Sequence, residues 1–199
     1  MPLFPALFDK TVFCSRLESN RRKQRSNRRV SYDSLESRQL LAGIVINEFL
    51  ATNNSGLVDD NGNTTDWIEL YNYGGLNVNL AGYSLTDDPG NPTKYVFPSQ
   101  TLAASQYLVV FAGDDTDPLA GTDLFTGFGL NSSGENLSLY DANGTLVSEF
   151  SAGGADYPVQ VSDVSYGYRY NGFFNQPRYF STPTPWTANT NPSVGIVEQ

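Results

Sequence analysis

Short strand-like runs separated by turn residues constrain the fold of this chain more than any other sequence feature. Turn-forming pairs such as Asn61-Gly62 and Asn143-Gly144 separate most of these runs, and no window keeps the period of an amphipathic helix. Short strands without alternating helices predict an all-β sandwich of two sheets. The predicted strands are residues 44–50, 66–72, 83–86, 94–97, 106–111, 124–130, 136–140, 145–150 and 165–170.

Two of these runs carry more specific information. Residues 107–111 are apolar at every position, which is typical of a central strand that is buried on both faces. Residues 139–146 read Leu-Tyr-Asp-Ala-Asn-Gly-Thr-Leu, which predicts a β-hairpin because Asn-Gly favours a tight turn.

The charge of the chain is divided unevenly between its two parts. Residues 1–43 hold nine Lys and Arg against four Asp and Glu, whereas residues 44–199 hold three against seventeen. The second part, with a net charge of −14, repels phosphate backbones. We therefore expect a protein or glycan partner on the cell surface rather than nucleic acid.

Residue types that most enzymes need are missing from the sequence. It contains no histidine, so the usual general base and the commonest metal ligand are absent. Its one cysteine is Cys14, outside the predicted sandwich, which excludes an internal disulfide. We expect a domain that is not an enzyme, with no catalytic residues and no cofactor except the calcium ion considered below.

Residues 1–43 are predicted to be a basic, mostly disordered leader. Arginine and lysine cluster at 21–29 among serine and asparagine, with few apolar residues to support a core. The apolar run at 40–46 is short for an export signal, and no run approaches the 18 or more apolar residues of a membrane span. Such a leader can bind nucleic acid or anionic lipid nonspecifically, but as an export segment it needs no partner.

A series of short motifs runs through the predicted sandwich. Residues 46–48 read Ile-Asn-Glu and residues 66–72 read Asp-Trp-Ile-Glu-Leu-Tyr-Asn. Over residues 44–190 this series resembles the lamin tail domain of bacterial secreted and surface proteins. The resemblance implies an immunoglobulin-like β-sandwich that acts as an accessory interaction module. Further matching segments lie at 80–87, 97–98, 106–111, 184–185 and 188–189.

Two positions depart from the pattern of the family. A tyrosine is inserted at 165–169, where a Gly-Arg pair is common, and Trp186 stands where a glycine usually follows Thr-Pro. Elsewhere the matching residues have structural roles: Trp67 and Leu70 are expected in the core, and Asn72 and Gly82 in turns.

The ends of the chain suggest a larger protein. Residues 35–42 read Leu-Glu-Ser-Arg-Gln-Leu-Leu-Ala, which resembles a sorting motif of large extracellular bacterial proteins and implies a secreted or cell-surface location. The alternative is a helical turn before the first strand. Residues 191–199 are predicted to be an extension, and their apolar spacing is typical of the first strand of a missing domain. The chain is then either an interaction module or the front part of a hydrolase or spore-coat-type kinase.

An acidic turn at 59–66 is the candidate metal site. Asp59, Asn61, Asn63 and Asp66 place oxygen-bearing side chains around Gly62, a pattern that suits Ca²⁺. The glutamate that closes an EF-hand loop is missing. A plain turn rich in Asp and Asn is therefore the simpler interpretation, and a calcium-stabilised structural linker is the alternative.

Three other groups of side chains have competing interpretations. Glu48 and Glu69 could form the carboxylate pair of a glycoside hydrolase, but that chemistry requires a cleft and a defined separation. The cluster Asp114, Asp115 and Asp117 is expected to be solvated. The last group, aromatic residues that either fill the core or present rings to a sugar or protein, is Tyr166, Tyr168, Tyr170, Phe173, Phe174, Tyr179, Phe180 and Trp186.

Overall fold

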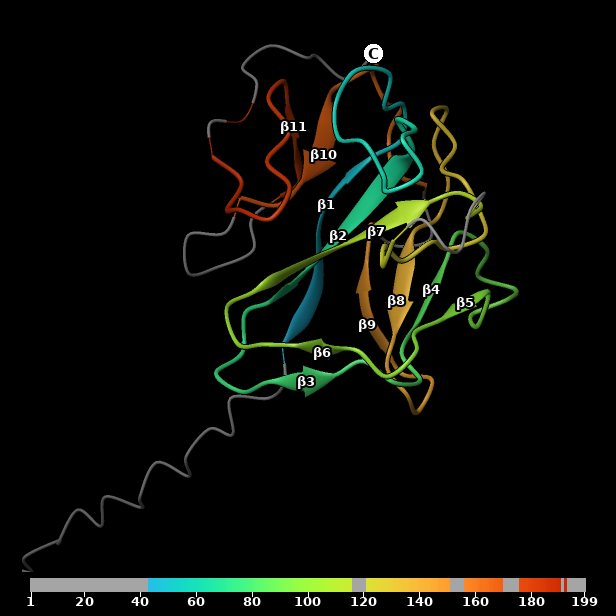
Figure 1. The fold of residues 1–199 in the computed structure, drawn as a ribbon, viewed down its shortest axis with the longest axis vertical. Helices are drawn as coiled ribbons and strands as arrows, with labels where there is room; N and C mark the ends of the chain where they lie inside the picture. Colours follow the sequence, from blue (N-terminus) through green and yellow to red (C-terminus); the bar gives the residue numbers. More distant parts are fainter. Residues whose placement is uncertain (1–42, 116–120, 151–155, 170–175, 191, 193–199) are drawn as a thin grey trace, which may run out of the picture. The chain divides into compact units, whose positions relative to one another are not determined.

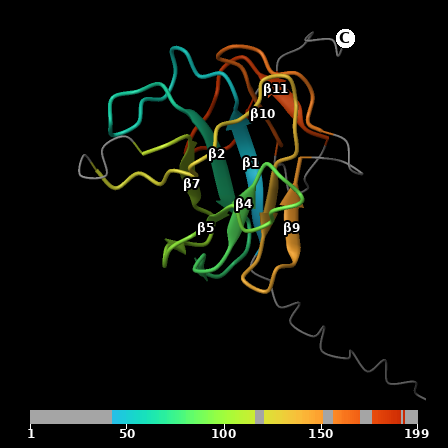
Figure 2. The ribbon, with the colours of Figure 1, turned by 90° about the vertical axis from the view of Figure 1, so that its right-hand side faces the viewer.

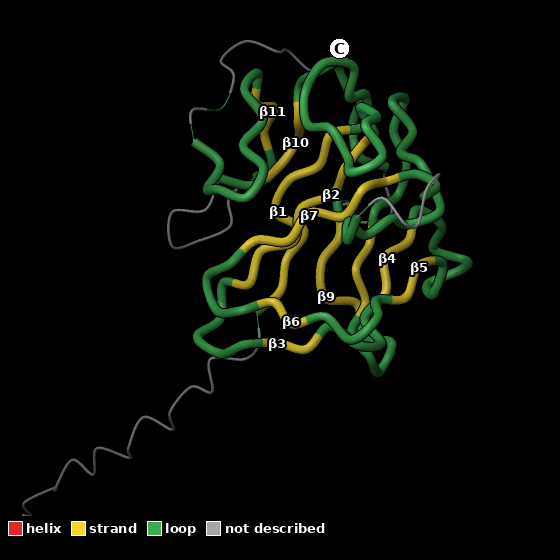
Figure 3. Tube along the Cα trace, viewed as in Figure 1, coloured by secondary structure: helices red, strands yellow, loops and turns green. Residues whose placement is uncertain are grey.

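The computed structural model describes residues 43–115, 121–150, 156–169, 176–190 and 192. All of them belong to the compact unit Ser37–Gln199, one of two units in the chain. These residues form strands and loops without a helix (Figure 3), so they include no helix that is long and apolar enough to cross a membrane. The predicted leader, except Gly43, and nearly all of the 191–199 extension lie outside the described residues.

One sheet has five strands in the order β11-β10-β1-β2-β7, and every neighbouring pair is antiparallel. Its centre is the long pair β1 and β2, in which Phe49 lies opposite Ile68. The register of β2 with β7 places Ile68 opposite Val110. The strands are β1 (Ile44–Leu50), β2 (Asp66–Asn72), β7 (Tyr107–Ala112), β10 (Ser165–Gly167) and β11 (Arg178–Phe180).

The other layer consists of shorter strands. A four-stranded antiparallel sheet has the order β5-β4-β8-β9, and a separate two-stranded ladder joins β3 to β6. The strands are β3 (Val78–Asn79), β4 (Ser84–Thr86), β5 (Tyr95–Val96), β6 (Thr101–Leu102), β8 (Ser138–Tyr140) and β9 (Leu146–Glu149).

The two larger sheets face each other as the layers of a sandwich (Figures 1 and 2). Strand β1 packs against β8 and β9, and the backbone N–H of Ile46 donates a hydrogen bond of 3.1 Å to the Ser148 hydroxyl in β9. This all-β, immunoglobulin-like sandwich confirms the predicted fold class.

Alternating side chains of the five-stranded sheet fill the space between the layers. Phe49 is fully buried and contacts three aromatic rings, with centroid distances of 5.0 Å to Phe150, 4.6 Å to Tyr157 and 5.9 Å to Tyr166. Edge-to-face and tilted pairs of this kind contribute energy beyond their buried area. The aromatic cluster therefore forms the centre of the hydrophobic core.

The hairpin predicted at 139–146 is confirmed. Strands β8 and β9 pair across it, and Gly144 adopts a positive φ of 77° that a side chain would strain. The Asp141 carboxylate accepts hydrogen bonds from the backbone N–H groups of Thr145 (2.8 Å) and Asn143 (2.9 Å). These bonds lower the pKa of Asp141, with the Thr145 bond as the largest cause.

The strand predicted at 124–130 is wrong. Only Phe125 forms a bridge, to Phe111, and Gly127 then turns the backbone with a φ of 70°. The prediction for 165–170 is also too long, because β10 ends at Gly167 and Tyr168 pairs instead with the backbone oxygen of Asn47. Strands β3, β6 and β11 were not predicted, because two or three residues show no detectable period.

Candidate functional site

The outer face of the five-stranded sheet, away from the sandwich core, carries the unusual side chains of this protein. In β2, Ile68 and Leu70 point into the core, so Trp67 and Glu69 point outward. The register of β1 against β2 shifts between Ile46 and Glu48. Such a bulge interrupts the alternation, and the side chains of Asn47 and Glu48 consequently both make their contacts on the outer face.

A C-terminal segment, residues 181–189, covers this face and is fixed by the Glu48 carboxylate. Glu48 is completely buried. It accepts hydrogen bonds from the Thr184 backbone N–H (3.3 Å), the Thr184 hydroxyl (3.1 Å) and the Ser165 hydroxyl. Burial raises the pKa of Glu48, and the hydrogen bonds oppose that effect.

Glu69 holds the same segment two residues further on. It is also completely buried and lies opposite Glu48 in the β1–β2 ladder. Its carboxylate accepts hydrogen bonds from the Asn47 side-chain amide (2.8 Å) and the backbone N–H of Trp186. Burial and the neighbouring charge of Glu48 raise the pKa of Glu69 to about 8.

Asn189 closes this network of hydrogen bonds. Its side-chain amide donates to the backbone oxygens of Tyr168 (2.9 Å) and Asn47 (3.3 Å). Its side-chain oxygen accepts from the side-chain amide of Asn47 (3.2 Å). The glutamate pair therefore has a structural role, because its carboxylates are buried and bind the chain itself. These contacts give no support to the glycoside hydrolase interpretation.

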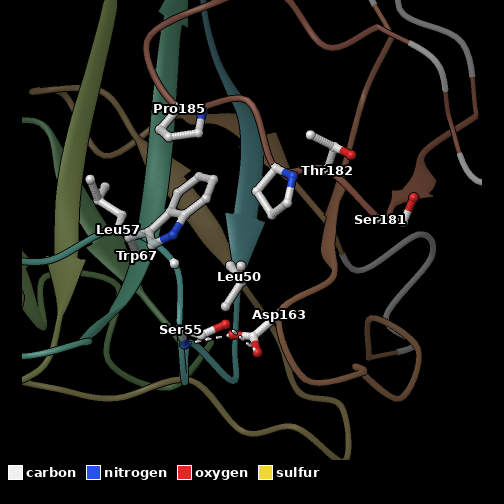
Figure 4. A pocket seen from close by; sticks show the side chains of 10 residues that line it. Leu50, Ser55, Leu57, Trp67, Asp163, Ser181, Thr182 and Pro185 are labelled. Carbon is white, nitrogen blue, oxygen red and sulfur yellow. Dashed lines mark hydrogen bonds between the residues drawn. The ribbon is translucent and has the colours of Figure 1, made fainter.

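A pocket of about 490 Å³ lies beside this network (Figure 4). Its apolar wall includes Leu50, Leu57 and Pro185 around the indole of Trp67, as Figure 4 shows. The indole is completely buried, and its N–H has no hydrogen-bond partner among the described residues. Trp67 is buried, as expected for a core residue, and lies in a second, smaller hydrophobic cluster on the outer face.

Asp163 forms the polar side of the Trp67 pocket. Its carboxylate accepts hydrogen bonds from the backbone N–H groups of Asn54 (2.7 Å) and Ser55 (2.9 Å) and from the Ser55 hydroxyl (2.9 Å). These bonds lower the pKa of Asp163, with the Asn54 bond as the largest cause. They join the loop after β1 to the turn before β10, so two distant segments shape the pocket.

A second cavity, of about 300 Å³, lies over β7. Trp186 forms part of its wall and is 52% exposed, with a positive φ of 64°. A bulky side chain in this left-handed region is an outlier that costs about 1–3 kcal/mol and persists only where its surroundings hold it. The other residues around the cavity are Gln100, Tyr107, Leu108, Val109, Thr122, Asp123 and Leu124.

The two aspartates of the predicted calcium site are hydrogen-bonded to different parts of the chain. The Asp59 carboxylate accepts hydrogen bonds from the backbone N–H groups of Asn61 (3.0 Å) and Asn63 (2.8 Å). The Asp66 carboxylate accepts from the N–H of Asn53 (2.9 Å). Among the described residues, no group of three or more Asp, Glu, Cys or His side chains could hold a metal ion. Asp59 therefore organises the turn, and calcium binding stays a prediction.

The predicted acidic and aromatic groups have different environments. Asp114 and Asp115 are exposed, as expected, and Asp117 lies outside the described residues. Tyr166 and Tyr179 are buried in the core, and Tyr168 packs against it. Phe180 is also buried, whereas Tyr170, Phe173 and Phe174 lie outside the described residues. The alternation at Tyr166 and Tyr168 thus marks the core and not a binding surface.

Comparison with known protein families agrees with the motifs between residues 46 and 111 and does not extend to those at 184–185 and 188–189. The Lamin Tail Domain profile matches residues 39–154. The chain belongs to the lamin tail domain family. This domain is immunoglobulin-like and generally serves as a non-catalytic interaction module. Among curated proteins, no sequence matches the chain.

Sequence reasoning missed most partners of the lamin tail domain's glutamate pair. These partners lie more than 100 positions away in the sequence. Glu48 bonds to Ser165 and Thr184, and Asn47 bonds to Asn189. No local pattern connects residues so far apart. The one available signal was the pair Asn47-Glu48, which places two polar residues inside an otherwise apolar strand.

Proposed function

We propose that this lamin tail domain is a non-catalytic binding module of a secreted or cell-surface protein. It takes its partner on the outer face of the five-stranded sheet, beside the C-terminal segment. The observation that carries the proposal is the Trp67 pocket, about 490 Å³ in volume, with apolar walls and a few polar groups such as Asp163. Pockets of this size and character are typical of binding sites.

The chemistry of the outer face supports binding rather than catalysis. The side chains that most resemble a catalytic pair, Glu48 and Glu69, are completely buried and bind the C-terminal segment. The sequence contains no histidine to act as a general base near neutral pH. A role as the accessory part of a larger hydrolase or kinase would use the same binding face.

The sequence supports a location at the cell surface. The Arg-rich leader and the motif at 35–42 are similar to segments that precede large extracellular bacterial proteins. The strongly acidic second part of the chain favours neutral or basic partners over nucleic acid and anionic lipid.

Co-sedimentation of the purified full chain with washed cell envelopes of the source organism tests this function. We expect saturable binding that Thr182→Arg weakens at least about tenfold, because Thr182 is exposed at the Trp67 pocket and a long side chain fills that space. Val96→Ala serves as the control, since Val96 is 49% exposed on β5 of the other sheet. The proposal is overturned if the binding is not saturable. It is also overturned if the Thr182→Arg and Val96→Ala variants bind equally strongly.

A further inference from the structure

Trp186 combines two costly features on the outer face of the sheet. It leaves half of a large aromatic side chain in water, at 52% exposure, and it adopts a φ of 64° that favours glycine. A glycine at this position would relieve the backbone and remove the exposed ring. Exposed rings on strained backbone are typical of functional positions.

The backbone of Trp186 is held firmly in this conformation. Its N–H donates a hydrogen bond to the completely buried carboxylate of Glu69. The N–H of the next residue, Thr187, donates a hydrogen bond of 3.1 Å to the Thr184 backbone oxygen. This bond closes a turn that contains Trp186. The backbone of Trp186 is therefore held in place on the outer face, and the residue lines the cavity over β7.

The cavity beside Trp186 is more polar than the Trp67 pocket. Gln100, Thr122 and Asp123 bring an amide, a hydroxyl and a carboxylate to its wall. The Asp123 carboxylate is fixed, because it accepts a hydrogen bond of 2.9 Å from the N–H of Asp60, and the Asp123 N–H donates one of 2.9 Å to the Asp60 carboxylate. These groups can accept and donate hydrogen bonds at set positions.

Tyr107 lines the cavity from β7. Its ring stacks on Tyr71 in β2, with centroids 4.5 Å apart and an interplanar angle of 20°. Burial raises the pKa of Tyr107 to about 12 from an ordinary value of 10, at which the phenol is already protonated at neutral pH. The cavity thus joins two aromatic side chains with neutral and acidic hydrogen-bonding groups.

We propose that this cavity is a subsite for one pyranose ring of a neutral glycan. The glycan is then the partner of the binding module proposed above, and the inference rests on that function. The C–H face of a sugar carries partial positive charge and packs on the negative face of an indole ring. Its hydroxyls donate to Asp123 and exchange hydrogen bonds with Gln100 and Thr122. Acidic polysaccharides are disfavoured by the seventeen Asp and Glu after residue 43.

Trp186→Gly is the decisive variant, because it removes the ring and relieves the backbone. In the envelope assay with the full chain, we expect it to weaken binding at least about tenfold while its melting temperature stays equal to or above that of the natural chain. Trp186→Tyr keeps a ring and is expected to retain more binding than Trp186→Gly. Equal binding by Trp186→Gly and the natural chain overturns the subsite.

The chemistry of the envelopes separates a glycan from a protein partner. Periodate cleaves sugar diols, so we expect periodate-treated envelopes to lose binding and protease-treated envelopes to keep it. Loss of binding after protease alone identifies a protein partner and overturns the glycan inference, although the proposed binding function stands. Absence of saturable binding to untreated envelopes refutes the proposed function itself.

Discussion

The two faces of the five-stranded sheet are buried in different ways. The inner face packs apolar side chains such as Phe49, Ile68 and Leu70 against the second sheet. The outer face buries two carboxylates, Glu48 and Glu69, beneath the C-terminal segment. Burial on the inner face is stabilised by apolar contact, whereas burial of the two carboxylates on the outer face depends on hydrogen bonds to a distant segment. The outer face should therefore respond to mutation and pH in ways that the inner face does not.

Truncation at the inner face should have the largest effect. Phe49→Ala removes the ring at the centre of the aromatic cluster, next to Phe150, Tyr157 and Tyr166. We expect it to lower the free energy of unfolding by about 3–5 kcal/mol, the range for large aromatic truncations in cores. Urea denaturation measures the loss. Leu76→Ala, at a position that is 62% exposed, should change stability by less than about 0.5 kcal/mol.

Removing one carboxylate from the outer face should have the next largest effect. Glu48→Ala leaves the Thr184 N–H and the Ser165 hydroxyl without their acceptor. We expect a loss of about 1–3 kcal/mol, the cost of unsatisfied buried donors, together with faster proteolysis within residues 181–189. If urea denaturation and limited proteolysis both match the natural chain, Glu48 does not fix the segment.

The pH dependence of stability should come partly from the outer face. Glu69 has a folded pKa of about 8, above its ordinary value of 4.5, so the folded state keeps a proton that the unfolded chain releases. Its contribution is fully present below pH 4.5 and is lost as the pH rises toward 8, by at most about 1.4 kcal/mol per pH unit. Glu69→Gln cannot titrate, so its urea midpoint should fall less between pH 5 and pH 9. Parallel pH profiles of the two proteins would contradict the raised pKa.

Calcium binding at the acidic turn would have the smallest effect. At about ten times the dissociation constant, a weak site stabilises the fold by about 1.4 kcal/mol. The calcium prediction therefore requires the melting temperature of the full chain to rise with Ca²⁺ but not with Mg²⁺, and Asp59→Asn to reduce that rise. A melting temperature that is the same in EDTA and in Ca²⁺ would contradict calcium binding at this turn.

The inner face was predictable from the sequence, and the outer face largely was not. Residues 66–72 and 107–111 were correctly predicted as strands, which pair as β2 and β7. The apolar run at 107–111 predicted a central strand, but β7 lies at the edge of the five-stranded sheet. The partners of Glu48 come from residues 165 and 184, and no local pattern records such distant pairing.

The two cavities could not be predicted from the sequence either, because residues that are distant in the sequence form their walls. The exposed tryptophan was visible only as the departure from glycine at position 186, and its left-handed backbone requires the structure. The Trp67 pocket combines residues 50–57, 163 and 181–185, which the fold brings together. The burial of Trp67 was predicted correctly, but its place in the smaller cluster on the outer face required the structure.

Amide hydrogen exchange at Thr184 and Trp186 tests most directly whether the buried glutamates hold the C-terminal segment on the sheet. Both backbone N–H groups donate to these carboxylates, so they should exchange slowly, like strand amides. In Glu48→Ala the Thr184 amide should lose this protection, while the core amide of Val110 keeps it. Exchange of Thr184 and Trp186 at the rate of unstructured chain in the natural protein would contradict the proposed attachment and the binding face that depends on it.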